Sequence, residues 1–224
     1  MSAHFITATG TDIGKTFVAR GLIGALRARG RPVEALKPVV TGFEPSEAAG
    51  TDSGLLLTAL GRPVTPENLA RVSPWRFAAP LAPDIAAARE NRRLDYAEMI
   101  EFCRSAVAKS RDALLIEGVG GVMSPVHPDH TVLDWMATLG LPLILVAGSY
   151  LGTISHTLTA LDAVARRGLV VASLVISESA DSPVKLGETR DAIAHFTPGL
   201  DVAALPRVAG RPAHPTFDRI ADRL

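Results

Sequence analysis

One stretch near the start of the chain, FITATGTDIGKTFVARGLIGAL from Phe5 to Leu26, constrains the fold more than any other. A short β-prone run ends at Thr7, a turn of small residues follows, and apolar residues then recur at the spacing of one helix face. A strand, a Gly-Lys-Thr turn and a helix in series are the context of a phosphate-binding P-loop. Unpaired N–H groups and the helix dipole make such a helix start attractive to anions.

Three residues at the end of this turn suit phosphate chemistry. Gly14 lets the backbone approach a phosphate closely, Lys15 can reach the outer phosphates, and Thr16 offers a hydroxyl to Mg²⁺. The turn is one residue longer than the usual G-x-x-x-x-G-K-[ST] pattern, and Ala8 replaces the leading glycine. A chance Gly-Lys-Thr sequence in a loop is the alternative, but the flanking strand and helix favour the P-loop.

The composition narrows the class of protein. The 224 residues include 23 basic and 23 acidic side chains, and this zero net charge argues against a mainly electrostatic binder of nucleic acid or membranes. The sequence shows no charged-then-apolar start and no run of about 18 apolar residues, so we expect neither a secretory leader nor a membrane span. The only cysteine, Cys103, lies in an apolar helical stripe. This pattern predicts an inert core residue, and a reducing cytoplasm is the simplest location.

Strand and helix patterns alternate along the whole sequence. The alternation predicts an α/β fold, a P-loop NTPase-like parallel sheet with helices on both faces, in one domain spanning residues 1–224. In such folds ligands bind at the carboxyl edge of the sheet. The predicted strands after the P-loop strand are residues 33–36, 113–116, 142–146, 170–176 and 202–205.

Several chemically suited side chains fall at this edge. Lys37 follows the strand 33–36, and a solvated surface lysine is the alternative. Glu117 follows the strand 113–116 and precedes a glycine-rich turn, which indicates the Mg²⁺-holding role of a Walker B acid rather than a structural turn. Asp52 opens a leucine-rich helix, where it is either a first-turn acid or a second Mg²⁺ contact.

Other segments carry weaker signals. Residues 62–93, which include the segment 75–83, are rich in proline and alanine. They predict an ordered loop that covers a site and forms a wall for the substrate, and a plain connector is the alternative. His127 and His130 have metal-like spacing, but no further Cys or His cluster accompanies them, so we interpret them as loop histidines. His156, near the start of another predicted helix, is interpreted as a packed or surface histidine.

Taken together, these motifs resemble the dethiobiotin synthetases of biotin biosynthesis, and the resemblance runs from Phe5 to about Arg207. No single motif is specific, but the KPVVTG and EGVGG motifs at these distances from the P-loop are specific together. The motifs are Gly14-Lys15-Thr16, KPVVTG at 37–42, TDS at 51–53, FAAPLAP at 77–83, EGVGG at 117–121, Leu151-Gly152-x-x-x-His156 and LPR at 205–207.

The resemblance implies an ATP-dependent, Mg²⁺-dependent cyclo-ligase that joins CO₂ or bicarbonate to 7,8-diaminopelargonic acid through a carbamate and a carbamic–phosphoric anhydride. It also implies a homodimer, in which residues 152–155 bind the substrate carboxylate across the interface. Lys37 and Lys15 are then the catalytic lysines, and Thr16, Asp52 and Glu117 hold Mg²⁺. The implied nucleotide contacts are Asp12, Ile13, Gly14, Lys15, Thr16, Phe17, Asp52, Glu117, Gly118, Val119, Gly120, Ser177, Glu178, Leu205, Pro206 and Arg207. The implied substrate contacts are Thr11, Lys37, Thr41, Gly152, Thr153, Ile154 and Ser155.

The sequence departs from the family pattern at several positions. Ser177 stands where an asparagine usually reads adenine, and a hydroxyl cannot supply the donor–acceptor pair of an amide. We therefore expect relaxed selection of the nucleotide base, with other triphosphates able to replace ATP. The remaining departures are Ala8 and Gly10 near the phosphates, Asp84 after the proline of the 77–83 motif, and Ser155 in place of an asparagine.

The main alternative is a partition-type nucleotide-switch ATPase of the same fold. Such ATPases usually carry a second lysine in the P-loop, and here Thr9 or Gly10 occupies that position. An amide-forming synthetase of cobalamin assembly would need a glutaminase domain with a nucleophilic cysteine. A non-catalytic nucleotide-binding module would not need the full set of Lys15, Thr16, Asp52 and Glu117.

Overall fold

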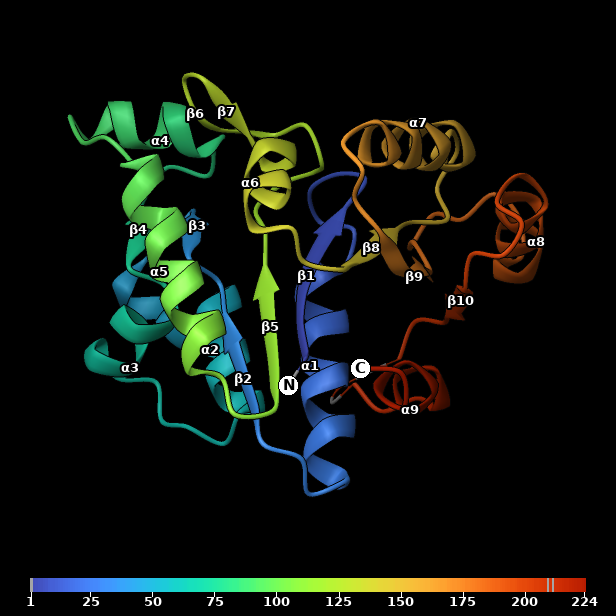
Figure 1. Ribbon diagram of the computed structural model, residues 1–224, viewed down its shortest axis with the longest axis horizontal. Coiled ribbons are helices and arrows are strands. Elements are labelled where there is room, and N and C mark those ends of the chain that lie inside the picture. The colour runs from blue at the N-terminus through green and yellow to red at the C-terminus, as the bar shows by residue number, and fades with distance from the viewer. Residues whose placement is uncertain (1, 209, 211) are drawn as a thin grey trace.

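A six-stranded parallel sheet organises the molecule (Figure 1). The computed structural model describes residues 2–208, 210 and 212–224. The strand order is β10-β9-β8-β1-β5-β2, so the P-loop strand β1 lies inside the sheet, between β8 and β5. The strands are β1 (Ser2–Ala8), β2 (Val33–Leu36), β5 (Ala113–Glu117), β8 (Leu143–Ala147), β9 (Val171–Ser177) and β10 (Val202–Leu205).

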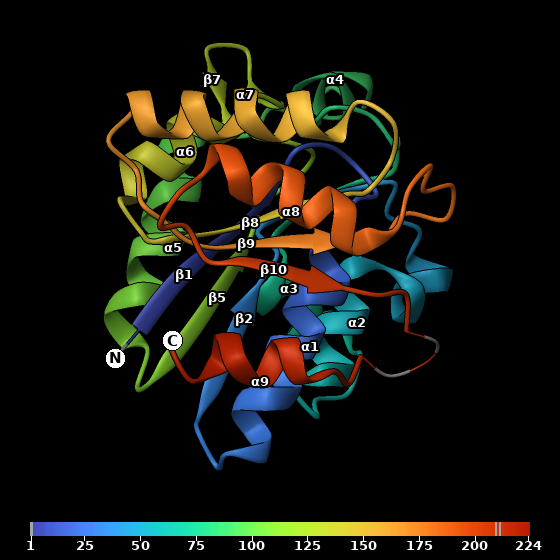
Figure 2. The ribbon, with the colours of Figure 1, turned by 90° about the vertical axis from the view of Figure 1, so that its right-hand side faces the viewer.

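Helices cover both faces of this sheet, as Figure 2 shows. Because successive side chains of a strand point to opposite faces, β5 supplies both cores. Its Leu114 and Ile116 join one hydrophobic cluster, and Ala113 and Leu115 join the other. One face is covered by α1 (Lys15–Ala28), α2 (Asp52–Ala59) and α9 (Pro215–Ala221). The other is covered by α5 (Tyr96–Lys109), α6 (Val132–Leu139), α7 (Thr153–Arg166) and α8 (Leu186–Phe196).

The prediction that residues 62–93 form a loop is mostly wrong. It contains α3 (Pro66–Val72), β4 (Trp75–Phe77) and α4 (Pro83–Arg89), and β4 pairs in parallel with β3 (Val39–Thr41) beside the main sheet. Proline suits the first turn of a helix, and Pro66 and Pro83 both occupy that position. A 3₁₀ helix, η1 (Pro45–Gly50), precedes α2.

The two histidines expected in a loop lie in a small antiparallel hairpin instead. His127 ends β6 (Pro125–His127) and His130 begins β7 (His130–Thr131). The His130 ring stacks on Tyr96 with centroids 3.8 Å apart, so packing accounts for it. Within the described residues, no three His, Cys, Asp or Glu side chains are grouped so that they could hold a metal ion.

Two further expectations concern Cys103 and membranes. Cys103, on α5, is buried in the core, and burial raises the pKa of its thiol to about 12, as expected for an inert core residue. In the part of the chain that the structure describes, no helix has both the length and the apolar character needed to cross a membrane.

Candidate functional site

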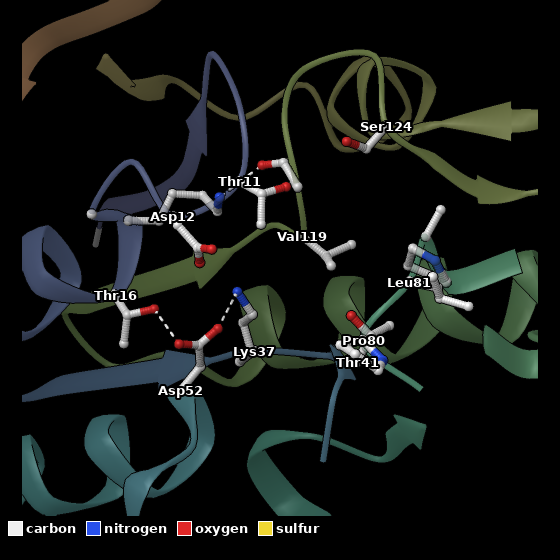
Figure 3. Close-up of a pocket in the computed structure, with 15 residues that line it drawn as sticks. Thr11, Asp12, Thr16, Lys37, Thr41, Asp52, Pro80, Leu81, Val119 and Ser124 are labelled. Atoms are coloured by element: carbon white, nitrogen blue, oxygen red, sulfur yellow. Dashed lines mark hydrogen bonds and ion pairs between the residues drawn. The ribbon is translucent and has the colours of Figure 1, made fainter. Parts of the chain in front are cut away.

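A cavity of about 600 Å³ opens at the carboxyl edge of the sheet (Figure 3). It lies between the P-loop, the ends of β2 and β5, and the segment that leads into α4. Its lining residues are Thr11, Asp12, Gly14, Lys15, Thr16, Lys37, Thr41, Asp52, Pro80, Leu81, Ala82, Pro83, Val119, Gly120 and Ser124.

The P-loop keeps its shape through residues with left-handed backbone conformation. Gly14 has φ +104° and Asp12 has φ +56°, and α1 begins at Lys15, directly after Gly14. A Cβ on Gly14 would lie 2.9 Å from the Ser177 hydroxyl, so only glycine fits against the end of β9. This geometry leaves the N–H groups at the start of α1 open toward the cavity.

Lys15 folds back over the loop. Its ammonium group donates to the carbonyl oxygens of Gly10 at 3.1 Å and Gly120 at 2.7 Å. Burial, followed by the positive charge of Lys37, lowers the pKa of Lys15 to about 8. Lys15 is therefore a cation whose charge titrates just above neutral pH, at the position where phosphates approach a P-loop.

Four charged or polar side chains converge next to Lys15. Thr16 donates to Asp52 Oδ1 at 2.8 Å and lies 2.7 Å from Glu117 Oε1. Lys37 Nζ lies 2.6 Å from Glu117 Oε1 and 3.0 Å from Asp52 Oδ2, and it donates to the Gly118 carbonyl at 2.8 Å. Asp52 is thus part of the cavity rather than only a helix cap, since the hydroxyl of Thr51 caps α2.

The charges of this network stabilise one another. Burial alone would lower the pKa of Lys37, which is only 3% exposed, but Glu117 and Asp52 raise the pKa above its usual value. Burial would raise the pKa of Asp52, but Lys37 and the Thr16 hydroxyl hold that pKa below its usual value. Lys37 is therefore a cation and Asp52 an anion at neutral pH.

The oxygen atoms of Thr16, Asp52 and Glu117 fit a magnesium ion. Mg²⁺ prefers hard oxygen ligands and is usually held by one or two carboxylates together with substrate phosphates. Glu117 Oε2 is buried, and no described residue gives it a hydrogen-bond partner. Burial of an unpaired carboxylate oxygen is costly, so this oxygen is available to a cation next to Thr16.

The glycine-rich turn after β5 packs directly on the P-loop. A Cβ on Gly121 would lie 3.1 Å from the backbone of Gly10, and one on Gly118 would lie 2.8 Å from the ring of Phe5. The backbone N–H of Val122 donates to the carbonyl of Ala8 at 3.0 Å. The glycines therefore bring the end of β5 against the P-loop turn.

The residues expected to hold the nucleotide base lie together at the ends of β9 and β10. Leu205 pairs with Ser177, and Glu178 donates its N–H to the Leu205 carbonyl at 2.9 Å. The carboxylate of Glu178 accepts the N–H of Arg207 at 3.0 Å. None of these residues, Pro206 included, lines the cavity, although Ser177 contacts the P-loop from outside it.

The residues expected to bind the substrate carboxylate lie apart from the cavity of the single chain. Gly152, with φ +94°, precedes α7, and the Thr153 hydroxyl donates to the Gly148 carbonyl at 2.8 Å. Ser155 is exposed, and Ile154 is 37% exposed. Two predicted nucleotide contacts, Ile13 and Phe17, pack partly against the core beneath α1.

The sequence did not predict one residue of the cavity, Ser124, and it predicted the wall at residues 80–83 only as part of a longer segment. The wall made by residues 80–83 falls inside the segment that was expected to cover a site. Ser124 was not expected at all, because a lone serine between a methionine and a proline matches no pattern. The carbonyl of Gly120 that accepts from Lys15 carries no sequence signal either.

The chain is similar to known proteins in sequence and in fold. A family model described as an AAA domain matches residues 2–211. The ATP-dependent dethiobiotin synthetase of Acidiphilium cryptum (strain JF-5) is 47% identical, over 86% of this chain and 87% of that protein. The enzyme of the same name from Caulobacter sp. (strain K31) is 50% identical, over 92% of this chain and 89% of that protein.

A solved structure matches the fold. The septum site-determining protein MinD from Pyrococcus horikoshii, complexed with Mg-ADP, has a TM-score of 0.56 and covers 99% of this chain and 95% of its own. At 16% identity this likeness shows the fold alone. The predicted P-loop NTPase-like parallel sheet is confirmed.

Proposed function

The chain belongs to the ATP-dependent dethiobiotin synthetases, ligases of biotin synthesis, and from this premise we propose that it carboxylates 7,8-diaminopelargonic acid with CO₂ and closes the ring of dethiobiotin. The observation that carries the proposal is the buried Lys37, placed between two carboxylates beside the P-loop lysine. A cation held in this way is suited to an anionic intermediate next to the outer phosphate of ATP.

The proposed reaction has three steps. One amine attacks CO₂ and loses a proton, which gives a carbamate. An oxygen of the carbamate attacks the γ-phosphorus of ATP, and the bond to ADP breaks. The second amine then attacks the carbonyl carbon and loses a proton, and the bond to phosphate breaks. The products are the cyclic urea, ADP and phosphate.

Positioning and charge neutralisation are the work of the protein in these steps. Lys37 holds the carbamate oxygen toward the phosphate, and Thr11 and Thr41 orient the substrate from the cavity wall. Lys15 neutralises the phosphoryl group in transfer, once ATP replaces the carbonyls that now accept from its ammonium group. The backbone of residues 12–17 cradles the phosphates, and residues 118–120 close the other side.

Thr16, Asp52 and Glu117 would hold Mg²⁺. When bound, the ion neutralises charge on the phosphate oxygens. Glu117 keeps Lys37 in place as well, because its Oε1 accepts from the Lys37 ammonium group. Glu117 Oε2 is then the oxygen that remains for the ion.

We propose that the nucleotide base binds at the ends of β9 and β10, next to Ser177, Glu178 and residues 205–207. Because Ser177 offers a hydroxyl rather than an amide, we expect kcat/KM for CTP or GTP within about tenfold of the value for ATP. Turnover with each triphosphate measures this ratio. Ser177→Asn should widen it in favour of ATP, and strict ATP dependence of the wild type would contradict it.

We propose that the carboxylate end of the substrate binds at the start of α7 in a partner subunit. Residues 152–155 lie outside the cavity of their own chain, so they serve a substrate only if a second copy brings them to it. The proposal therefore includes a homodimer. It also places the enzyme in the cytoplasm, where a reducing environment suits a chain with one buried cysteine.

An isotope experiment tests the proposed chemistry. Bicarbonate labelled with ¹⁸O is mixed with the protein, the diamine, ATP and Mg²⁺ in ordinary water, and the phosphate from a single turnover is analysed by mass spectrometry. The carbamate route predicts one ¹⁸O in each phosphate, because the bridging oxygen leaves with phosphorus. Cyclic urea formed with unlabelled phosphate would contradict the anhydride.

The same experiment separates the partition-type alternative. A switch ATPase would release unlabelled phosphate without the diamine and would form no cyclic urea. The comparisons favour the ligase, and the position of the second P-loop lysine is occupied by Thr9 or Gly10.

A further inference from the structure

Ser124 lines the cavity from the segment between β5 and β6 (Figure 3). It is half-buried, and its hydroxyl oxygen accepts the N–H of Gly121 at 2.7 Å. A serine hydroxyl carries one proton to donate besides the lone pairs that accept. Among the described residues, none accepts a hydrogen bond from this hydroxyl, so its proton is available to a ligand in the cavity.

The surroundings fix Ser124 before any ligand arrives. Its N–H donates to the Gly121 carbonyl at 3.0 Å, and its carbonyl accepts the N–H of Val132 at 2.9 Å, at the start of α6. A Cβ on Gly120 would collide with the Ser124 hydroxyl, so glycine is required there. Preorganised donors stabilise developing charge without reorganising during the reaction.

The position of Ser124 favours the substrate over the nucleotide. In Figure 3, Thr16 and Asp52 lie at one side of the cavity, whereas Ser124 lies at the other side with Leu81 and Thr41. The same Cβ, built on Gly120, would lie 3.9 Å from the Thr11 hydroxyl. The carbonyl of Gly120 accepts from Lys15 at 2.7 Å. Ser124 and Thr11 therefore flank the backbone to which Lys15 is tied, on the side away from the proposed Mg²⁺ ligands.

We propose that Ser124 is a further binding residue of this reaction and that its hydroxyl donates a hydrogen bond to an oxygen of the carboxylated amine, the carbamate. The inference rests on the proposed function. Hydrogen bonds to charged groups are among the stronger ones in proteins, so the loss of this bond should be measurable in catalysis. Lys37 and Ser124 would then hold the carbamate from opposite walls of the cavity.

The experiment compares Ser124→Ala and Ser124→Thr with the wild type. For each, kcat/KM for 7,8-diaminopelargonic acid at saturating ATP is measured together with the affinity for Mg-ADP and the Tm. Ser110→Ala is the matched control, because Ser110 caps the end of α5 and its hydroxyl has no partner among the described residues. We expect Ser124→Ala to lower kcat/KM for the diamine at least tenfold, with Mg-ADP affinity within twofold of the wild type.

The Ser124→Thr variant and the affinity for Mg-ADP distinguish a hydrogen bond to the substrate from a purely structural role of Ser124. Ser124→Thr keeps the hydroxyl and should retain most of the activity. Parallel loss of Mg-ADP affinity and Tm in Ser124→Ala would show that Ser124 acts only by holding Gly120 and Gly121, and it would overturn the inference. An unimpaired Ser124→Ala variant would overturn it as well. A wild type that forms no cyclic urea would overturn the proposed function itself, which is a different result.

Discussion

At the scale of single residues, the burial of Lys37 is tolerated because two carboxylates and a carbonyl surround its ammonium group. Glu117, 1% exposed, and Asp52, 42% exposed, supply the two negative charges. Taking a charge out of water is costly unless it is paired, so each member of this group depends on the others. Sequence reasoning placed Lys37 and Glu117 at the same sheet edge, because both follow buried strands. The distances between them depend on packing that the sequence does not display.

Lys37→Ala should therefore reduce stability as well as activity. The variant leaves Glu117 buried without its cation, and we expect a loss of about 3 kcal/mol in the free energy of unfolding. Urea denaturation measures that loss, and the turnover assay should show at least a thousandfold lower rate. Lys109→Ala, at the exposed end of α5, is the control and should change neither quantity. A stable but inactive Lys37→Ala variant would contradict the buried network.

Lys15 predicts a pH dependence of nucleotide binding. Its pKa is lowered to about 8 by burial and by Lys37, so the ammonium group is charged below that pH and loses its proton above it. We expect the affinity of the ligand-free enzyme for ATP to fall as pH rises from about 7.5 to 9.5. ATP binding near pH 8.5 should take up protons, because phosphates favour the charged lysine. Calorimetry in buffers of different ionisation enthalpy measures this uptake, and release of protons would contradict the assignment.

At the scale of elements, buried strands were the easiest to predict. β10 has the predicted bounds 202–205, and the predicted strand 113–116 extends by one residue, Glu117. Both strands have continuous apolar sequences, because helices cover both faces of the sheet. The helix after the P-loop ends near Gly30, whose φ of +69° suits only glycine without strain.

The elements that were missed are short and depend on distant partners. β4 has three residues and exists because Trp75 and Phe77 pair with β3, more than 30 residues earlier. The hairpin that carries His127 and His130 is supported by Tyr96, on α5. Ser124 reaches the cavity because the β5–β6 connection turns back on Gly121. None of these contacts leaves a periodic pattern in the sequence.

The packing of α9 on α1 gives a prediction about helix glycines. A Cβ on Gly21 would collide with the ring of Phe217, whereas a Cβ on Gly24 would meet nothing within 4 Å. Gly21→Ala should therefore cost about 1–3 kcal/mol in the free energy of unfolding by overpacking. Gly24→Ala, in the same helix, should stabilise by about 0.5–1 kcal/mol. Urea denaturation of both variants measures the difference, and equal effects would contradict the close approach of the two helices.

At the scale of the whole molecule, two exposed apolar side chains follow strands that end at the functional edge. Leu151 is 85% exposed and Met123 is 60% exposed, and both follow strands that end at that edge. Exposed large apolar side chains of this kind mark interaction surfaces when they cluster. They are consistent with the proposed homodimer, whose second copy would bring residues 152–155 to the cavity.

The dimer proposal is tested by Leu151→Asp. The charge should weaken the association of two copies, and sedimentation analysis should show the variant as a monomer while the wild type is a dimer. KM for the diamine should rise at least tenfold, with Mg-ADP affinity unchanged, because the proposed nucleotide site lies within one chain. Val170→Asp, at an exposed apolar residue before β9, is the control. A wild type that sediments as a monomer with full activity would contradict the shared site.

The most direct measurement is a turnover assay of the wild-type protein. It is mixed with 7,8-diaminopelargonic acid, ¹³C-labelled bicarbonate, ATP and Mg²⁺, and the products are analysed by mass spectrometry. We predict a cyclic urea with one ¹³C at its carbonyl carbon, formed in equal amount to ADP and absent when the diamine or ATP is left out. Release of ADP at the same rate with and without the diamine, with no labelled urea, would contradict the proposed cyclo-ligase.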